Sequence, residues 1–157
     1  MGARLIRTRH FTPASASPDD TWRLLRWCVE HGASEFSVRV MCEAGEPAPT
    51  ADRFEDTFAP ALVGEERRHV LSHPVGEDRP TIRLWRLDDR TEALLHPYLP
   101  QGLFTNAVDP RGWIEDPLVY RNGELMLGVV THERDGVLRA TADEMRELDA
   151  LGFVFGQ

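Results

Sequence analysis

Hydrophobic and polar residues alternate along this chain with a period of two in some segments and a period near 3.6 in others. The clearest helical period covers residues 17–31, where Ser17 is placed to cap the helix and Pro18 suits its first position. Gly32 follows, and glycine favours the left-handed conformation in which many helices end. One broad face of this helix is apolar and carries Trp22, Leu24, Leu25, Cys28 and Val29. The pattern therefore predicts an amphipathic helix packed on a core.

A period of two marks the predicted strands. Residues 36–42 alternate between apolar and polar side chains, which is typical of a half-buried strand. Residues 81–87 carry apolar groups on both faces and predict a more deeply buried strand. Residues 4–11 predict a short strand with its arginines toward water. Between these strands and the C-terminal third, residues 88–97 predict a short helix that begins at an aspartate and ends near a proline.

The C-terminal third carries the strongest turn and cap signals. Asn122 and Gly123 lie between two apolar runs, which is the strongest short signal for a β-hairpin. Residues 133–136 offer a second turn. Thr141 and Glu144 have the spacing of a capping box and predict that the last helix begins there. This part of the chain is expected to form three antiparallel strands followed by a helix.

Together these elements predict the fold class. Strands cluster and are joined by short turns, so hairpins outnumber the long crossovers that a parallel sheet needs. A length of 157 residues fits one domain with an adequate hydrophobic core. We therefore expect a single α+β domain over residues 1–157, with a mainly antiparallel sheet and about three helices packed on one face.

Two histidines, His69 and His73, raise the question of a metal site. On a helix, residues four apart lie close enough to bind one ion, whereas on a strand they stand about 13 Å apart at about 3.3 Å per residue. Pro74 favours extended backbone at the residue before it, so we expect a hairpin of residues 68–75 with 80–87. His69 and His73 are therefore only weak metal candidates, and no cofactor is expected.

Composition and charge exclude several classes of function. The net charge is −8, which disfavours nucleic acid as a partner and suits a basic protein. All 18 basic residues are arginine, so mechanisms that need a lysine are excluded, and a GC-rich, bacterial coding bias accounts for this usage. Two cysteines make no disulfide framework. No apolar run is long enough to span a membrane and no secretory leader is found, so a cytoplasmic protein without a membrane segment is expected.

No complete catalytic motif is present. The chain has no G-x-S-x-G, no G-x-G-x-x-G and no P-loop pattern. The weak candidates for acid–base catalysis are His69, His73, His132 and Glu133. They would need to converge with Glu115 or Asp116 to support a small hydrolase with or without a metal ion. We expect either that convergence or a protein that binds without catalysis.

A long segment without periodicity, residues 97–117, is the best pointer to function. Connections of this length are uncommon in compact domains unless they have a role. Aromatic and acidic side chains gather there as candidate partner-binding residues: Tyr98, Phe104, Asp109, Trp113, Glu115 and Asp116. The alternative is that Phe104 and Trp113 close the edge of the core.

Three functions remain open from the sequence. The first is a non-catalytic protein-binding module, immunity-like or regulatory, with a basic partner. The second is the small hydrolase, and the third is a small-molecule sensor with a pocket between sheet and helices. The sequence leaves the oligomeric state open.

Overall fold

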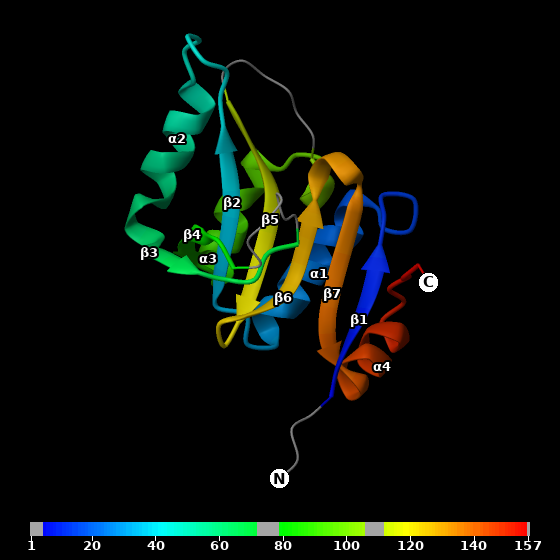
Figure 1. Cartoon of the computed structure of the whole chain (residues 1–157). Helices are drawn as coiled ribbons and strands as arrows, with labels where there is room; N and C mark the ends of the chain where they lie inside the picture. The colour runs from blue at the N-terminus through cyan, green and yellow to red at the C-terminus, as the bar shows by residue number, and fades with distance from the viewer. Residues whose placement is uncertain (1–4, 72–78, 106–111, 157) are drawn as a thin grey trace.

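A seven-stranded antiparallel sheet forms the centre of the protein (Figure 1). The computed structural model describes residues 5–71, 79–105 and 112–156. The strands lie side by side in the order β1-β7-β6-β5-β2-β4-β3. Their bounds are Ile6–Phe11 (β1), Glu35–Met41 (β2), Leu62–Arg67 (β3), Thr81–Arg86 (β4), Trp113–Arg121 (β5), Glu124–Val130 (β6) and Asp135–Thr141 (β7). Every neighbouring pair is antiparallel, which confirms the predicted fold class.

Four α-helices pack against one face of this sheet within the described residues. They are Pro18–Glu30 (α1), Pro49–Phe58 (α2), Asp89–Leu95 (α3) and Ala142–Ala150 (α4). Residues from all four helices join the strands in one large apolar cluster, and Figure 1 shows α1 and α3 behind the sheet. About three helices were expected, and α2 is the additional one.

The sequence pattern does not predict helix α2, Pro49–Phe58, because Pro60 disfavours one long helix through residues 53–63. Pro60 lies beyond the helix, in a short 3-10 turn over Ala59–Ala61, so it does not interrupt α2. Phe54 and Phe58 are four residues apart and both fully buried, which fixes the inner face of the helix.

The predicted caps and the Asn122–Gly123 turn are present, whereas the second turn, expected over residues 133–136, lies over 131–134 because β7 begins at Asp135. Ser17 and Asp20 form a capping box at the start of α1, and Thr141 and Glu144 form another at α4. β5 and β6 form a hairpin around Asn122 and Gly123. These features depend on near neighbours in sequence, which is why the sequence could predict them.

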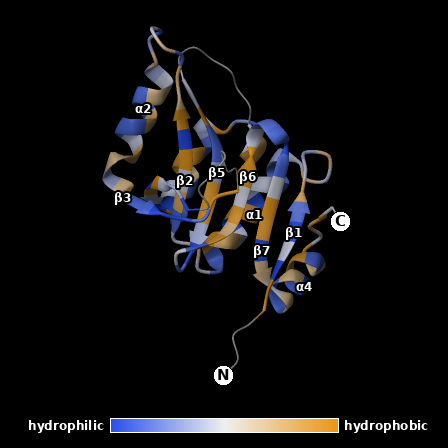
Figure 2. Ribbon diagram, viewed as in Figure 1, coloured by the Kyte–Doolittle hydropathy of each residue, from blue (hydrophilic) through white to orange (hydrophobic). Residues whose placement is uncertain are grey.

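The predicted hairpin arm at residues 68–75 is wrong within the described residues. The strand that pairs with β4 is β3, Leu62–Arg67, and residues 68–71 belong to no strand. β3 is an edge strand whose side chains are nearly all exposed, so it lacks the alternation that reveals a strand. Figure 2 shows the edge strands β1 and β3 as mostly hydrophilic, in contrast to β6 and β7.

The predicted loop over residues 97–117 is also partly wrong. It begins with two short 3-10 turns, His96–Tyr98 and Gly102–Phe104, and its last residues form the start of β5. Asp116 has a positive φ of 52° and is followed by Pro117, and this irregularity removes the period of two that would have revealed the strand.

The sheet face opposite the helices has a smaller apolar cluster. Its buried members are Leu84, Leu118, Tyr120 and Leu125, and Val70, Leu71 and Ile82 pack against them. Because Val70 and Leu71 come from the connection between β3 and β4, that connection covers part of this face. We call this side of the sheet the open face.

Candidate functional site

A short segment, Arg68–Leu71, crosses the open face and is called the crossing segment here (Figure 1). The Tyr120 hydroxyl donates a hydrogen bond of 2.8 Å to the His69 carbonyl oxygen. Burial raises the pKa of this hydroxyl above its usual value, so it remains a neutral donor. The crossing segment is thereby held against β5.

Arg68 anchors the start of the crossing segment. Its side chain is only 9% exposed, donates to Glu35 at 3.0 Å, and also pairs with Glu66. The guanidinium lies 5.3 Å from the centre of the Tyr120 ring. A buried arginine with two carboxylate partners and a ring beneath it fixes this end of the segment in place.

Gly128 leaves the space that the other end of the segment fills. A Cβ atom at this position would lie 2.6 Å from Leu71 Cδ1 and 2.9 Å from Leu118 Cδ2. Both contacts are ends of flexible side chains, so we expect Gly128→Ala to cost about 1 kcal/mol of unfolding free energy, the low end for overpacking. Urea denaturation measures this. Gly156→Ala is the control, because its Cβ would meet nothing closer than 3.8 Å. Equal stability of the two variants would show that Leu71 is not packed on Gly128.

A cavity of about 390 Å³ lies between the crossing segment and the open face. Residues of four strands and of the β3–β4 connection line it, and most are apolar: Val38, Val70, Pro80, Ile82, Leu118, Val129 and Val130. The polar lining residues are Ser37, Arg39 and Asp116. An apolar hollow with a few polar groups is the usual form of a small-molecule site.

A β-bulge in β5 brings Asp116 to this cavity. Ser37 pairs with Leu118, but the next pair is Arg39 with Glu115, so one side of the ladder has an extra residue. The left-handed conformation of Asp116 is uncommon outside glycine, although aspartate tolerates it better than most residues. Bulges of this kind redirect side chains and are frequent beside binding sites.

Asp116 is held by a reciprocal pair of hydrogen bonds with Thr131. The Asp116 amide donates to Thr131 Oγ1 at 2.9 Å, and the Thr131 amide donates to Asp116 Oδ1 at 2.8 Å. One carboxylate oxygen is therefore used to fix the side chain at the end of β6.

The other carboxylate oxygen, Asp116 Oδ2, accepts no hydrogen bond from any described residue. It is the only such buried side-chain atom in the part of the chain that the structure describes, and the Asp116 side chain is only 6% exposed. Arg39 Nη1 is 3.5 Å away, an ion pair without hydrogen-bond geometry, and the same atom lies 3.8 Å from Glu115. A buried carboxylate oxygen without a donor is rare in folded proteins.

Beside the cavity, strands β2 and β4 are neighbours in the sheet but are hydrogen-bonded over only a short length. β2 and β4 are joined by only two residue pairs, Glu35 with Arg86 and Phe36 with Trp85. Beyond Phe36, a second hollow of about 610 Å³ lies between β2, β4 and α2. Since Ser37, Arg39 and Ile82 are among the residues that line both hollows, the cavity adjoins this short stretch of pairing.

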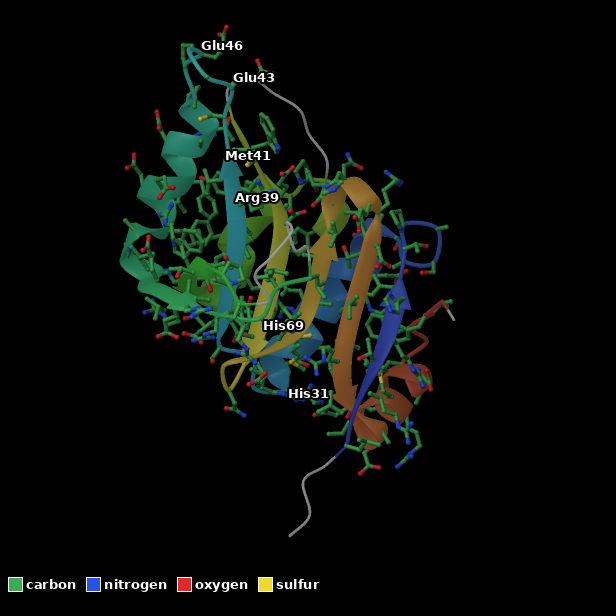
Figure 3. The ribbon with its side chains drawn as sticks, in the orientation of Figure 1. His31, Arg39, Met41, Glu43, Glu46 and His69 are labelled. Atoms are coloured by element: carbon green, nitrogen blue, oxygen red, sulfur yellow. The ribbon has the colours of Figure 1, made fainter. Side chains whose placement is uncertain are left out.

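The histidine candidates do not converge on the cavity. His69 is half-buried in the crossing segment, and His132 and Glu133 are exposed in a 3-10 turn after β6, Thr131–Glu133. Figure 3 shows His69 well separated from Arg39 along the sheet. No described histidine lines the cavity, and His73 lies outside the described residues. Among the described residues, no group of three or more histidine, cysteine, aspartate or glutamate side chains could hold a metal ion.

The candidate partner-binding residues are distributed between core and surface. The Tyr98 ring packs on Phe54 and its hydroxyl lies 3.0 Å from Thr57 Oγ1. Phe104 is 8% exposed and packs edge-on against Phe11. Phe104 belongs to the core, and Tyr98 is partly buried and packs against the core.

The remaining members of that set lie on or near β5. Trp113 is half-buried, and its indole nitrogen donates to Glu115 at 3.2 Å. Asp109 lies outside the described residues. Of the five predicted residues that the structure describes, only Asp116 lines the cavity.

Sequence reasoning did not find Ser37, Arg39 or Leu118 as site residues. Ser37 and Arg39 alternate with apolar residues on β2 and look like ordinary outward-facing positions. The Asp116-Pro117 pair inside an apolar run is the one local signal of an irregular strand, because proline is excluded from regular inner strands.

Comparisons with protein-family models, curated proteins and solved structures found no match for this chain. Among the described residues, no helix has the length and apolar character needed to cross a bilayer.

Proposed function

We propose that this protein is a non-catalytic small-molecule-binding protein, a sensor, whose ligand occupies the cavity under the crossing segment. The observation that carries the proposal is the apolar cavity with one buried carboxylate oxygen that has no hydrogen-bond donor. An apolar lining supplies affinity, and a single polar group sets the orientation of the ligand.

Two features favour binding over catalysis. Among the described residues, Asp116 is the only acidic one that lines the cavity, and no histidine, cysteine or second carboxylate lines it together with Asp116. Acid–base and nucleophilic mechanisms need at least two such groups within hydrogen-bond distance. The hydrolase hypothesis therefore has less support than binding.

A basic partner protein is the second candidate, because the net charge is −8 and the exposed Glu43 and Glu46 follow β2. Figure 3 labels both residues. Tyr98 and Phe104 do not help such a partner, since both contribute to the core cluster. We rank this function below the first.

Filling the cavity tests the proposed function. Ser37 pairs with Leu118 on the open face, so Ser37→Phe places a ring where a ligand would lie. We expect wild-type protein to bind 1-hexanol or n-hexylamine with a sub-millimolar Kd, since six carbons at about 0.8 kcal/mol each give about 5 kcal/mol. Titrations followed by amide NMR shifts measure this, and Ser37→Phe should abolish the shifts at Leu118 and Val130.

Ser34→Phe is the matched control, because Ser34 is exposed and lines none of the cavity. It should bind the probes as wild type does. If neither probe binds wild-type protein, or if Ser37→Phe binds them as well as wild type, the proposed function is wrong and the basic partner becomes the better candidate.

A further inference from the structure

We infer that the ligand carries a protonated amine, and that this amine binds Asp116 Oδ2 while the apolar part of the ligand fills the cavity. The inference rests on the proposed function and adds the chemical class of the ligand. It is carried by three observations about Asp116: its unused oxygen, the charges around it, and the way its side chain is fixed.

The unused oxygen needs a donor from outside the described protein groups. Thr131 satisfies Oδ1, and no donor among the described residues reaches Oδ2 with hydrogen-bond geometry. A carboxylate prefers charged donors, because hydrogen bonds between ionised partners are shorter and stronger than neutral ones. A ligand donor at Oδ2 would complete the set of hydrogen bonds.

The local charges favour a cation over an anion. Arg39 lies 3.5 Å from Asp116 in the cavity and 3.8 Å from Glu115, which stands next to Asp116 on β5 but does not line the cavity. One arginine between two carboxylates leaves a negative charge in excess, and a single positive charge on the ligand neutralises it. An anionic ligand would instead increase the excess beside a buried carboxylate, which is unfavourable.

Arg39 does not have to move out of the site for the amine to bind Asp116. Its side chain is 57% exposed, and its Nη1 atom already lies within 3.8 Å of Glu115. When an amine takes Oδ2, Arg39 keeps Glu115 as its partner. Neither arginine nor carboxylate is then left unpaired, which is the condition for charged groups to be tolerated at a partly buried site.

The position of the carboxylate is fixed before any ligand arrives. The β-bulge and the two hydrogen bonds with Thr131 hold Asp116 in a left-handed conformation that most residues avoid. Preorganisation of this kind raises affinity because no side-chain freedom is lost on binding. Backbone irregularities with this cost gather at ligand sites.

The lining of the cavity sets the shape of the remainder of the ligand. Val70 and Pro80 cover it from the β3–β4 connection, and Leu118 and Val130 form its base. These side chains offer no hydrogen bonds, so the body of the ligand is aliphatic or aromatic. The ligand class is therefore a hydrophobic amine of small size.

Three probes with one carbon skeleton test the charge: n-hexylamine, 1-hexanol and hexanoate. An aliphatic amine resembles the lysine side chain, whose pKa is about 10.4, and is protonated at pH 7. We expect wild-type protein to bind the amine at least about tenfold more tightly than the alcohol, and to bind hexanoate weakest. Isothermal titration calorimetry and amide NMR shifts give the three Kd values.

Asp116→Asn is the informative variant. Asparagine keeps an oxygen for the Thr131 amide and tolerates the left-handed conformation, so the variant should fold. The amide shift of Thr131 reports whether that hydrogen bond is kept. We expect the preference for the amine to vanish, while the binding of 1-hexanol stays within about twofold of wild type.

Arg39→Gln separates the roles of the two charges. If Asp116 binds the amine, this variant keeps or strengthens amine binding, because a competing cation is removed.

Equal binding of amine and alcohol by wild-type protein would overturn the inference while leaving the proposed function intact. Tightest binding of hexanoate, lost in Arg39→Gln, would also overturn it and indicate an anionic ligand. Binding of none of the three probes would instead contradict the proposed function itself.

Discussion

Replacement of Trp85 by alanine is expected to lower the unfolding free energy by about 3–5 kcal/mol, the largest effect of any single substitution considered for this protein. Trp85 on β4 is 1% exposed and stacks on Phe36 at a centroid distance of 5.6 Å. The Phe54 ring meets it edge-on at 5.4 Å, and the Arg83 guanidinium lies 4.7 Å from its ring. Its removal leaves a large apolar cavity where β2, β4 and α2 meet.

Urea denaturation of Trp85→Ala and wild-type protein measures this loss. The free energy of unfolding of such domains is about 5–15 kcal/mol, so the variant should keep only part of the stability of the wild type. Trp22→Ala is the matched control, because Trp22 is half-buried and stacks on His96 at the helix surface. A loss in Trp85→Ala no greater than that in Trp22→Ala would falsify the packing described for this corner of the core.

The second large effect is a loss of stability in acid that depends on Glu144. Arg121 donates to both carboxylate oxygens of Glu144, at 2.7 and 3.1 Å. The Thr141 amide donates to the same carboxylate at 2.8 Å. These hydrogen bonds, the arginine first, lower the pKa of Glu144 from 4.5 to about 2, although partial burial opposes the shift.

The sign of the effect follows from the lowered pKa. The folded state holds the proton of Glu144 less tightly than the unfolded state, so this group stabilises the fold fully above about pH 4.5. The contribution falls as the pH drops toward about 2, where the folded carboxylate itself becomes protonated. Between about pH 4.5 and about pH 2, the free energy of unfolding therefore falls by about 3 kcal/mol.

Urea unfolding at a series of pH values between 6 and 2 tests this on wild type and Glu144→Gln. The variant should be less stable than wild type near neutral pH, and the difference should disappear near pH 2. Glu133→Gln serves as the control, since Glu133 is exposed, and its profile should follow that of wild type. A constant difference between Glu144→Gln and wild type across the whole range would show that the charge of Glu144 contributes nothing.

The sequence predicted elements whose signals are local. Ser17, Asn122 and Thr141 act on residues within one helical turn or one hairpin, so their roles follow from short spacings. The elements that could not be predicted depend on their neighbours in space. β3 is an exposed edge strand with no apolar face, and α2 lies in a segment whose proline falls just after the helix.

The candidate site was only partly predictable for the same reason. Asp116 was selected as an acidic residue near aromatics, but its importance comes from a bulge, from Thr131 and from an oxygen without a donor. The cavity combines Ser37, Val70 and Leu118, which come from three distant parts of the chain. No pattern of spacing along one segment indicates that these residues meet.

The scarcity of pairing between β2 and β4 has a consequence for kinetics. Two residue pairs join these strands, whereas six join β2 to β5 and five join β3 to β4. The β3–β4 hairpin can therefore separate from the rest of the sheet with fewer broken backbone hydrogen bonds than any other part of it. Since this seam borders the cavity, we expect substitutions that weaken the β2–β4 pairing to change the association and dissociation rates of a ligand more than its affinity.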